Sequence, residues 1–194
     1  MDESSSTDAP AGHRPPEFPD FVASRGRQLL RTAFLLTGGD VYLAEDLTQE
    51  ALGRIFVKWH RISRLENPSG YAQTVLANTF LSYRRRRSTS ERVTAEFPDV
   101  AVDDPDPAVR LTLLRALGQL PVKDRAVVVL RFWEDRSVEE TATALRLSAT
   151  AVRSRSTRAL ARMRILLDDE LDTAVPRNPA TSPSSRKAVL RNAN

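Results

Sequence analysis

Cysteine is absent from this chain of 194 residues, and histidine occurs only twice. Without thiols the protein can form neither a disulfide framework nor a thiolate metal site, and nothing favours an oxidising compartment. His13 lies in a proline-rich stretch and His60 lies beside Trp59, so the two imidazoles are too far apart in sequence to indicate a metal centre. We therefore expect no metal ion and no other cofactor.

Long hydrophobic runs are also missing, and the polar, acidic start lacks the apolar core of a signal peptide. We expect a cytoplasmic protein without membrane contact. The net charge of +4 is unevenly distributed, because residues 109–167 carry twelve basic and five acidic side chains whereas residues 89–108 carry one and six. A basic module beside an acidic connector favours a nucleic-acid partner.

Two short helices joined by a tight turn are predicted within residues 137–167. Ser137 followed three residues later by Glu140 is a capping-box signature for the first helix. Ser148 can cap the second helix, which we expect to begin at Ala149. A helical period places one apolar stripe along this second helix, made of Val152, Ala159, Leu160, Met163 and Leu167.

The other sides of this second helix carry small residues flanked by arginines. Between Thr141 and Leu167 there are six arginines and no acid, so a solvated helix stabilised by its own salt bridges lacks the carboxylates it needs. Small residues let the helix backbone approach base edges, and arginines reach phosphates or guanine. The composition therefore favours DNA contact by a helix-turn-helix.

Three further helices are predicted in residues 18–87, at about Phe18 to Thr37, from Asp40 as cap to about Ile62, and from Pro68 to Arg87. On the middle helix Asp46, Gln49 and Glu50 share one polar face. Periodicity alone favours an ordinary solvated face there, with Glu50 paired to Arg54.

The third of these helices combines the aromatics Tyr71, Phe80 and Tyr83 with four consecutive arginines from Arg84 to Arg87. Rings that stack on bases beside a basic run suit single-stranded or melted nucleic acid. The alternatives are that the aromatics belong to the core and that the arginines suit a helix C-terminus. Four arginines cover all sides of a helix, which favours nucleic acid for the run, while both interpretations of the aromatics stay open.

The predicted fold class is all-α, with two small helical domains joined by a flexible acidic linker. Residues 88–106 lack a helical period and would span roughly 65 Å when fully extended. Beyond them, Pro107 and Pro121 each open a helix, and the second carries apolar residues expected to pack beneath the helix-turn-helix: Val127, Val128, Leu130, Phe132 and Trp133. The domain ranges are 18–87 and 107–167, flanked by disordered tails at 1–17 and 168–194.

Three segments, in this order and spacing, resemble the extracytoplasmic-function group of bacterial RNA polymerase sigma factors: LLRTAFLLTGGDVYLAEDLTQEALGRIFVKW, NPSGYAQTVLANTFLSYRRRR and LGQLPVKDRAVVVLRFWEDRSVEETATALRLSATAVRSRSTRALARMR. The sequence of the first domain, residues 18–87, is most similar to an actinobacterial subgroup of this family. The resemblance implies a subunit without catalytic activity that binds core RNA polymerase and directs initiation by reading −35 and −10 promoter elements and melting DNA. Core polymerase and promoter DNA are the implied partners, with an anti-sigma factor as a further one.

The resemblance also implies roles for individual residues, and it reverses the preference for a solvated face on the middle helix. Docking on the clamp helices of the largest polymerase subunit would involve Asp46, Leu47, Gln49, Glu50 and Arg54. Reading and opening of the −10 element would involve Trp59, Tyr71, Asn78, Arg84, Arg85 and Arg86. Major-groove contact at the −35 element would involve Ser148, Thr150, Arg153, Ser154, Arg155 and Arg158. The chain departs from the family in three places: the family commonly has an aspartate near Ser82, a glycine or asparagine near the turn at Arg146, and a larger apolar residue near Ser156.

Two other functions fit parts of the chain. A dimeric helix-turn-helix regulator that binds duplex DNA by itself explains residues 108–167, but it leaves the Asp46 face and the arginine run without a role. A nuclease that uses Glu45, Asp46 and Glu50 lacks a nearby histidine, lysine or second carboxylate cluster.

Overall fold

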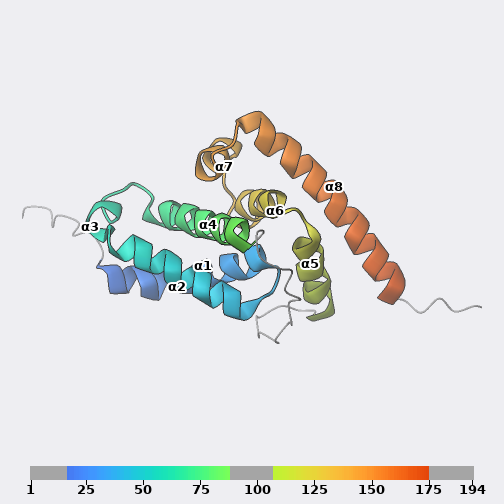
Figure 1. The fold of residues 1–194 in the computed structure, drawn as a ribbon, viewed down its shortest axis with the longest axis horizontal. Helices are drawn as coiled ribbons and strands as arrows, with labels where there is room; N and C mark the ends of the chain where they lie inside the picture. Colours follow the sequence, from blue (N-terminus) through green and yellow to red (C-terminus); the bar gives the residue numbers. More distant parts are fainter. Residues whose placement is uncertain (1–16, 88–106, 175–194) are drawn as a thin grey trace, which may run out of the picture.

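The computed structural model describes residues 17–87 and 107–174, and every regular element in these ranges is a helix (Figure 1). This confirms the predicted all-α class. The predicted linker at 88–106 lies outside the described residues, as do residues 1–16 and 175–194 of the two predicted tails. Side chains are described for residues 17–87 and 109–168.

The first module, as we call the part up to residue 87, contains four helices: α1 Phe18–Thr37, α2 Val41–Phe56, α3 Trp59–Ile62 and α4 Pro68–Arg87. The predicted continuous helix to Ile62 is therefore wrong in one respect, because it is divided between α2 and α3. Lys58 interrupts it, since its backbone leaves the helical region at φ −113° and ψ 13°. Its N–H bonds to the Ile55 carbonyl at 3.0 Å, which closes a tighter turn than that of an α-helix.

Local side-chain and backbone caps set the ends of these helices. The Asp40 carboxylate accepts a hydrogen bond from the Leu43 N–H at 2.9 Å. The Asn67 side chain accepts one from the Gly70 N–H at 2.7 Å, which confirms the predicted start of α4. At the end of α1, Gly38 adopts the left-handed conformation with φ 76°, as expected for a helix-terminating glycine.

The second module, residues 107–174, contains four α-helices and a π-helical turn: α5 Pro107–Gln119, α6 Val122–Val128, η1 Val129–Trp133, α7 Val138–Leu145 and α8 Ala149–Ala174. The capping box is present, because Ser137 Oγ accepts from the Glu140 N–H at 3.0 Å and Glu140 accepts from the Ser137 N–H at 2.7 Å. The helix-turn-helix pair α7 and α8 and the start of α8 at Ala149 match the prediction, while α8 continues past its predicted end.

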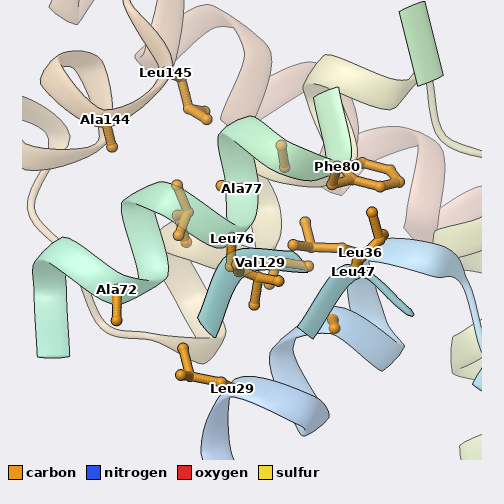
Figure 2. Packing of buried hydrophobic residues seen from close by; sticks show 14 of the residues in the cluster. Leu29, Leu36, Leu47, Ala72, Leu76, Ala77, Phe80, Val129, Ala144 and Leu145 are labelled. Carbon is orange, nitrogen blue, oxygen red and sulfur yellow. The ribbon is translucent and has the colours of Figure 1, made fainter. Parts of the chain in front are cut away.

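One apolar core runs through both modules. Its buried residues come from α1, α2, α3 and α4 on one side and from α6, η1, α7 and α8 on the other. Figure 2 shows Phe80, Leu76 and Leu36 of the first module close to Val129 of the second. Phe80 is fully buried, so one of the three aromatics on α4 belongs to the core.

Two predictions about the core are wrong. Phe132 and Trp133 were expected beneath the helix-turn-helix, yet each is 52% exposed. The π-helical turn accounts for this, because its wider winding places them off the face on which Val129 and Leu130 are buried. Leu160, predicted on the apolar stripe of α8, is also exposed, whereas Val152, Ala159 and Met163 are buried as expected.

Candidate protein and nucleic-acid interfaces

The acidic face of α2 points away from the core. Asp46 and Gln49 are exposed, and Glu50 forms an ion pair with Arg54 at 2.5 Å. Arg54 also donates to the Thr79 hydroxyl on α4 at 3.3 Å. Leu47 is only 1% exposed, so it belongs to the core and can act at this face only by holding the helix in place. The exposed face thus presents one carboxylate and one amide beside a neutralised pair.

A groove of about 1100 Å³ lies where the end of α2 and one side of α4 meet α6 and the end of α7. It brings together four of the residues predicted to act at the −10 element, Tyr71, Asn78, Arg84 and Arg85. No carboxylate lines the groove, and both modules contribute to its cationic side chains. These six are Arg54, Lys58, Arg84, Arg85, Lys123 and Arg146. A groove of this charge attracts a phosphate backbone, and the Tyr71 ring in its lining offers one surface for base stacking.

Trp59 lies outside the groove lining, in an aromatic cluster where α1 meets α3. Its ring centroid is 5.4 Å from that of Phe18 and 4.8 Å from that of Phe21, and Phe18 stacks in turn against Phe56 at 5.1 Å. Arg86 is exposed at the end of α4, also beyond the lining of the groove. The structure thus separates these two predicted residues from the other four.

The exposed side of α8 begins directly at the helix-turn-helix turn. Ser148 caps α8, because its Oγ accepts from the Ala151 N–H at 3.1 Å. Arg153 is 60% exposed and pairs with Glu139 of α7 at 3.2 Å. The remaining exposed residues of the predicted reading surface are Thr150, Ser154 and Arg158.

Arg155 points inward instead. Its Nη1 donates to the buried carboxylate of Asp124 on α6, and the arginine side chain is 27% exposed. This ion pair links α8 to α6, so Arg155 holds α8 in position instead of lying on its exposed side. Sequence pattern alone placed Arg155 among the surface arginines, since its partner lies 31 positions earlier in the chain.

Arg125 is a buried cation that the sequence pattern did not single out. Its guanidinium donates to the Leu36 carbonyl at the end of α1 at 3.0 Å and to the Leu120 carbonyl at 3.3 Å. Burial, and then the positive charge of Arg84, lowers the pKa of Arg125 to about 10. Its role is structural, because it satisfies carbonyls at helix ends in both modules.

Among residues 17–87 and 109–168, no three His, Asp or Glu side chains gather where they could hold a metal ion. No helix in the described part of the chain is both long enough and apolar enough to cross a bilayer.

Comparison with family models gives a match over each module. Residues 21–89 match the model described as Sigma-70 region 2, and residues 110–163 match the model described as Sigma-70, region 4. These ranges contain the acidic face, the cationic groove on α4, and the helix-turn-helix.

Curated relatives resemble most of the chain. An RNA polymerase sigma-E factor of Streptomyces avermitilis is 42% identical over 150 residues, which cover 76% of this chain and 83% of the relative. The ECF RNA polymerase sigma factor SigE of Mycolicibacterium smegmatis is 31% identical over 160 residues, which cover 77% of this chain and 61% of the relative.

Solved structures share the fold. The sigma factor RpoE in complex with the anti-sigma factor NepR from Bartonella quintana has a TM-score of 0.67 at 24% identity, covering 78% of this chain and 96% of that one. CnrH in complex with the cytosolic domain of CnrY has a TM-score of 0.53 at 25% identity, and the match covers 79% of this chain and 88% of that one.

Proposed function

Because the chain belongs to the sigma-70 family, in its extracytoplasmic-function group, we propose that it binds core RNA polymerase, reads −35 and −10 promoter elements and melts DNA. The observation that carries this proposal is the presence, in one chain, of the arginine-rich helix α8 and a separate cationic groove that Tyr71 lines. Residues 18–87 would act at the −10 element and residues 107–167 at the −35 element.

At the −35 element, α8 would lie in the major groove of duplex DNA. Thr150 and Ser154 are small and exposed, so the helix backbone can approach base edges, while Arg153 and Arg158 reach guanine or phosphate. Arg155 would take no direct part, because its ion pair with Asp124 holds α8 in position.

At the −10 element, the groove along α4 would hold one melted strand. Arg84 and Arg85 would contact phosphates, the partly exposed Tyr71 ring would stack on a base, and the Asn78 amide would bond to a base edge. Unstacking bases costs a few kcal/mol per step, and these contacts would offset that cost. Core polymerase would hold both modules on one promoter, so that two weak sites act as one tighter site.

Polymerase docking would use the exposed side of α2. Asp46 and Gln49 would contact the clamp helices of the largest subunit, with the Glu50–Arg54 pair beside them. The solved relatives in complex with NepR and CnrY support an anti-sigma factor as a further partner.

Reconstituted transcription with core RNA polymerase over a promoter library tests the proposal. We expect transcripts that start downstream of a shared two-part motif only when the chain is added. A gel shift on the selected duplex, with and without core polymerase, tests the rival regulator. Tight binding by the free chain together with silent transcription would establish an ordinary helix-turn-helix repressor or activator.

A further inference from the structure

Arg153 is an exposed arginine of α8 whose position a carboxylate fixes. Its Nη2 atom lies 3.2 Å from Oε1 of Glu139 on α7. Arg155 of the same helix also has an ion-pair partner, but that pair is turned inward. The exposed Arg158 has no carboxylate within ion-pair distance in the part of the chain that the structure describes. Arg153 therefore differs from the other arginines of the predicted reading surface.

Glu139 itself is held at the start of α7. It lies in the first turn, directly before Glu140, which completes the capping box with Ser137. Its carbonyl accepts from the Thr143 hydroxyl at 2.9 Å. Figure 1 shows α7 beside the start of α8, the end that would enter the major groove. The carboxylate thus stands on a capped helix next to the proposed reading surface.

We propose that Glu139 is a positioning residue for promoter specificity, because it orients Arg153 toward a base edge and keeps it from binding phosphate. The ion pair stands on the structure alone, whereas its effect on sequence reading rests on the −35 function proposed above.

Orientation matters because arginine reads guanine with two N–H groups at once. The guanidinium of Arg153 has five N–H donors, and the bond to Glu139 uses one of those on Nη2. The remaining donors can address a base. A side chain that is already held loses less rotamer freedom when it binds, whereas Arg158 must lose that freedom on contact with DNA.

The charge of Glu139 affects the choice between base and phosphate. Phosphate contacts place a protein on duplex DNA, but they carry no sequence information directly. The carboxylate neutralises Arg153 and repels a phosphate that approaches it, whereas a neutral base edge meets no such repulsion. Glu139 therefore lowers the affinity for DNA of any sequence and raises the discrimination between sequences.

The ion pair can be tested on the free full-length chain without DNA. NMR of isotope-labelled arginine side chains identifies Arg153 by the resonance that R153K removes. E139A should shift this resonance. The matched control is D135N, which removes the same charge from an exposed residue just before α7 and should leave the resonance unchanged. Asp135 has φ 47°, and asparagine tolerates that conformation well.

Binding of the full chain to duplex DNA of random sequence tests the repulsion of phosphate. E139A frees Arg153 for one phosphate contact, so it should bind about threefold more tightly at low salt. The slope of log affinity against log salt concentration should also be steeper by about 0.9. D135N should keep the parent slope. In an R153A background, E139A should leave the slope unaltered.

Transcription with core RNA polymerase from promoters that carry each base pair at every −35 position measures discrimination. R153A should lower the preference at one base pair by about tenfold, and E139A should lower it there by about threefold. E139Q should retain most of the preference, because its amide oxygen can still accept from Arg153. E139A should have no further effect once R153A is present.

The following results would overturn the positioning role. One is an Arg153 resonance that E139A leaves unchanged. Another is an effect of E139A, on salt slope or base preference, that is equal with and without Arg153. A third is a uniform loss over all promoters with the preference unchanged, since a residue needed only for folding behaves in that way. Failure of the parent chain to direct transcription would sink the proposed function instead, and the resonance and the salt slope would still decide whether Glu139 holds Arg153.

Discussion

Gly38, the residue directly after α1, lies against Gly118 of α5, where the backbones of the two modules approach each other closely. A Cβ atom built on Gly38 would come within 2.9 Å of the Gly118 Cα and within 3.3 Å of the Arg125 guanidinium. Gly38 also has φ 76°, a conformation that favours glycine. The same position therefore ends α1 and lets α5 and Arg125 close over that end.

We predict that G38A lowers the free energy of unfolding by about 2 kcal/mol, because a left-handed alanine is strained and its methyl group meets backbone. Urea unfolding of the full chain measures the effect. G53A is the control: Gly53 lies inside α2, and apart from its chain neighbours and the backbone of its own helix nothing lies within 4 Å of an added Cβ, so alanine should raise stability by about 0.5–1 kcal/mol. Equal stability of G38A and the parent would mean that the two modules do not meet at this point.

Helix starts could be predicted from sequence because each cap and its partner lie within one turn. Asp40, Asn67 and Ser137 each bond to a backbone N–H three positions ahead, as their spacing indicates. The family-specific segments likewise indicate both modules, and the family models match the same two parts of the chain.

Contacts between the modules could not be predicted in the same way. Gln28 and Glu134 are 106 positions apart, and no local pattern marks either residue as half of a pair. The exposed side of α8 was predicted correctly apart from two residues. Leu160 is exposed although it was expected on the apolar stripe, and Arg155 turns inward toward a carboxylate in another helix. Burial of Phe132 was predicted wrongly because an α-helical period was assumed where the chain forms a π-helical turn.

The Arg155–Asp124 ion pair predicts that Arg155 contributes to stability, whereas the exposed Arg158 of the same helix does not. R155A should lower the free energy of unfolding by about 2 kcal/mol, because it leaves the buried Asp124 carboxylate without its partner. R158A removes an exposed side chain and should change stability by less than about 0.5 kcal/mol.

Duplex binding by the chain with core polymerase separates the two roles further. R158A should weaken binding to the selected −35 element, whereas R155A should affect binding only under conditions in which the second module begins to unfold. A fully stable R155A protein with weakened duplex binding would assign Arg155 to base reading after all.

Arg146 occupies the turn between α7 and α8 in the left-handed conformation, with φ 54°. The resemblance to the family predicted glycine or asparagine near this turn. R146G should stabilise the chain by about 1 kcal/mol in urea unfolding, because glycine adopts this conformation without strain. R146K keeps both the charge and the strain, so it should match the parent. A loss of stability in R146G would show that the arginine side chain outweighs its backbone strain.

Charge reversal on α2 tests the docking of core polymerase. D46K combined with E50K should abolish binding to core RNA polymerase in a pull-down assay while the helical content by circular dichroism stays the same. The exposed Glu50–Arg54 pair contributes less than about 1 kcal/mol, so its loss should not unfold α2. E45K, which reverses an exposed charge beside the predicted face, should bind normally. Full binding by the double variant would show that Asp46 and Glu50 do not contact core RNA polymerase.

The capping box of α7 predicts a pH-dependent contribution to stability. The bond from the Ser137 N–H, followed by the bond to the Ser137 side chain, lowers the pKa of Glu140 below its ordinary value of 4.5. A lowered pKa in the folded state stabilises the fold above pH 4.5, and this contribution disappears as the pH falls through the lowered pKa.

E140Q should therefore be less stable than the parent at neutral pH, by about 0.5 kcal/mol because the site is exposed to solvent. At an acidic pH below the lowered pKa of Glu140 the parent glutamate is protonated and the difference should shrink, since a neutral carboxyl and an amide are equivalent in charge. Paired urea titrations of the parent and E140Q at both pH values cancel the titration of the other carboxylates. A difference that stayed constant between the two pH values would show that the Glu140 charge plays no part in capping α7.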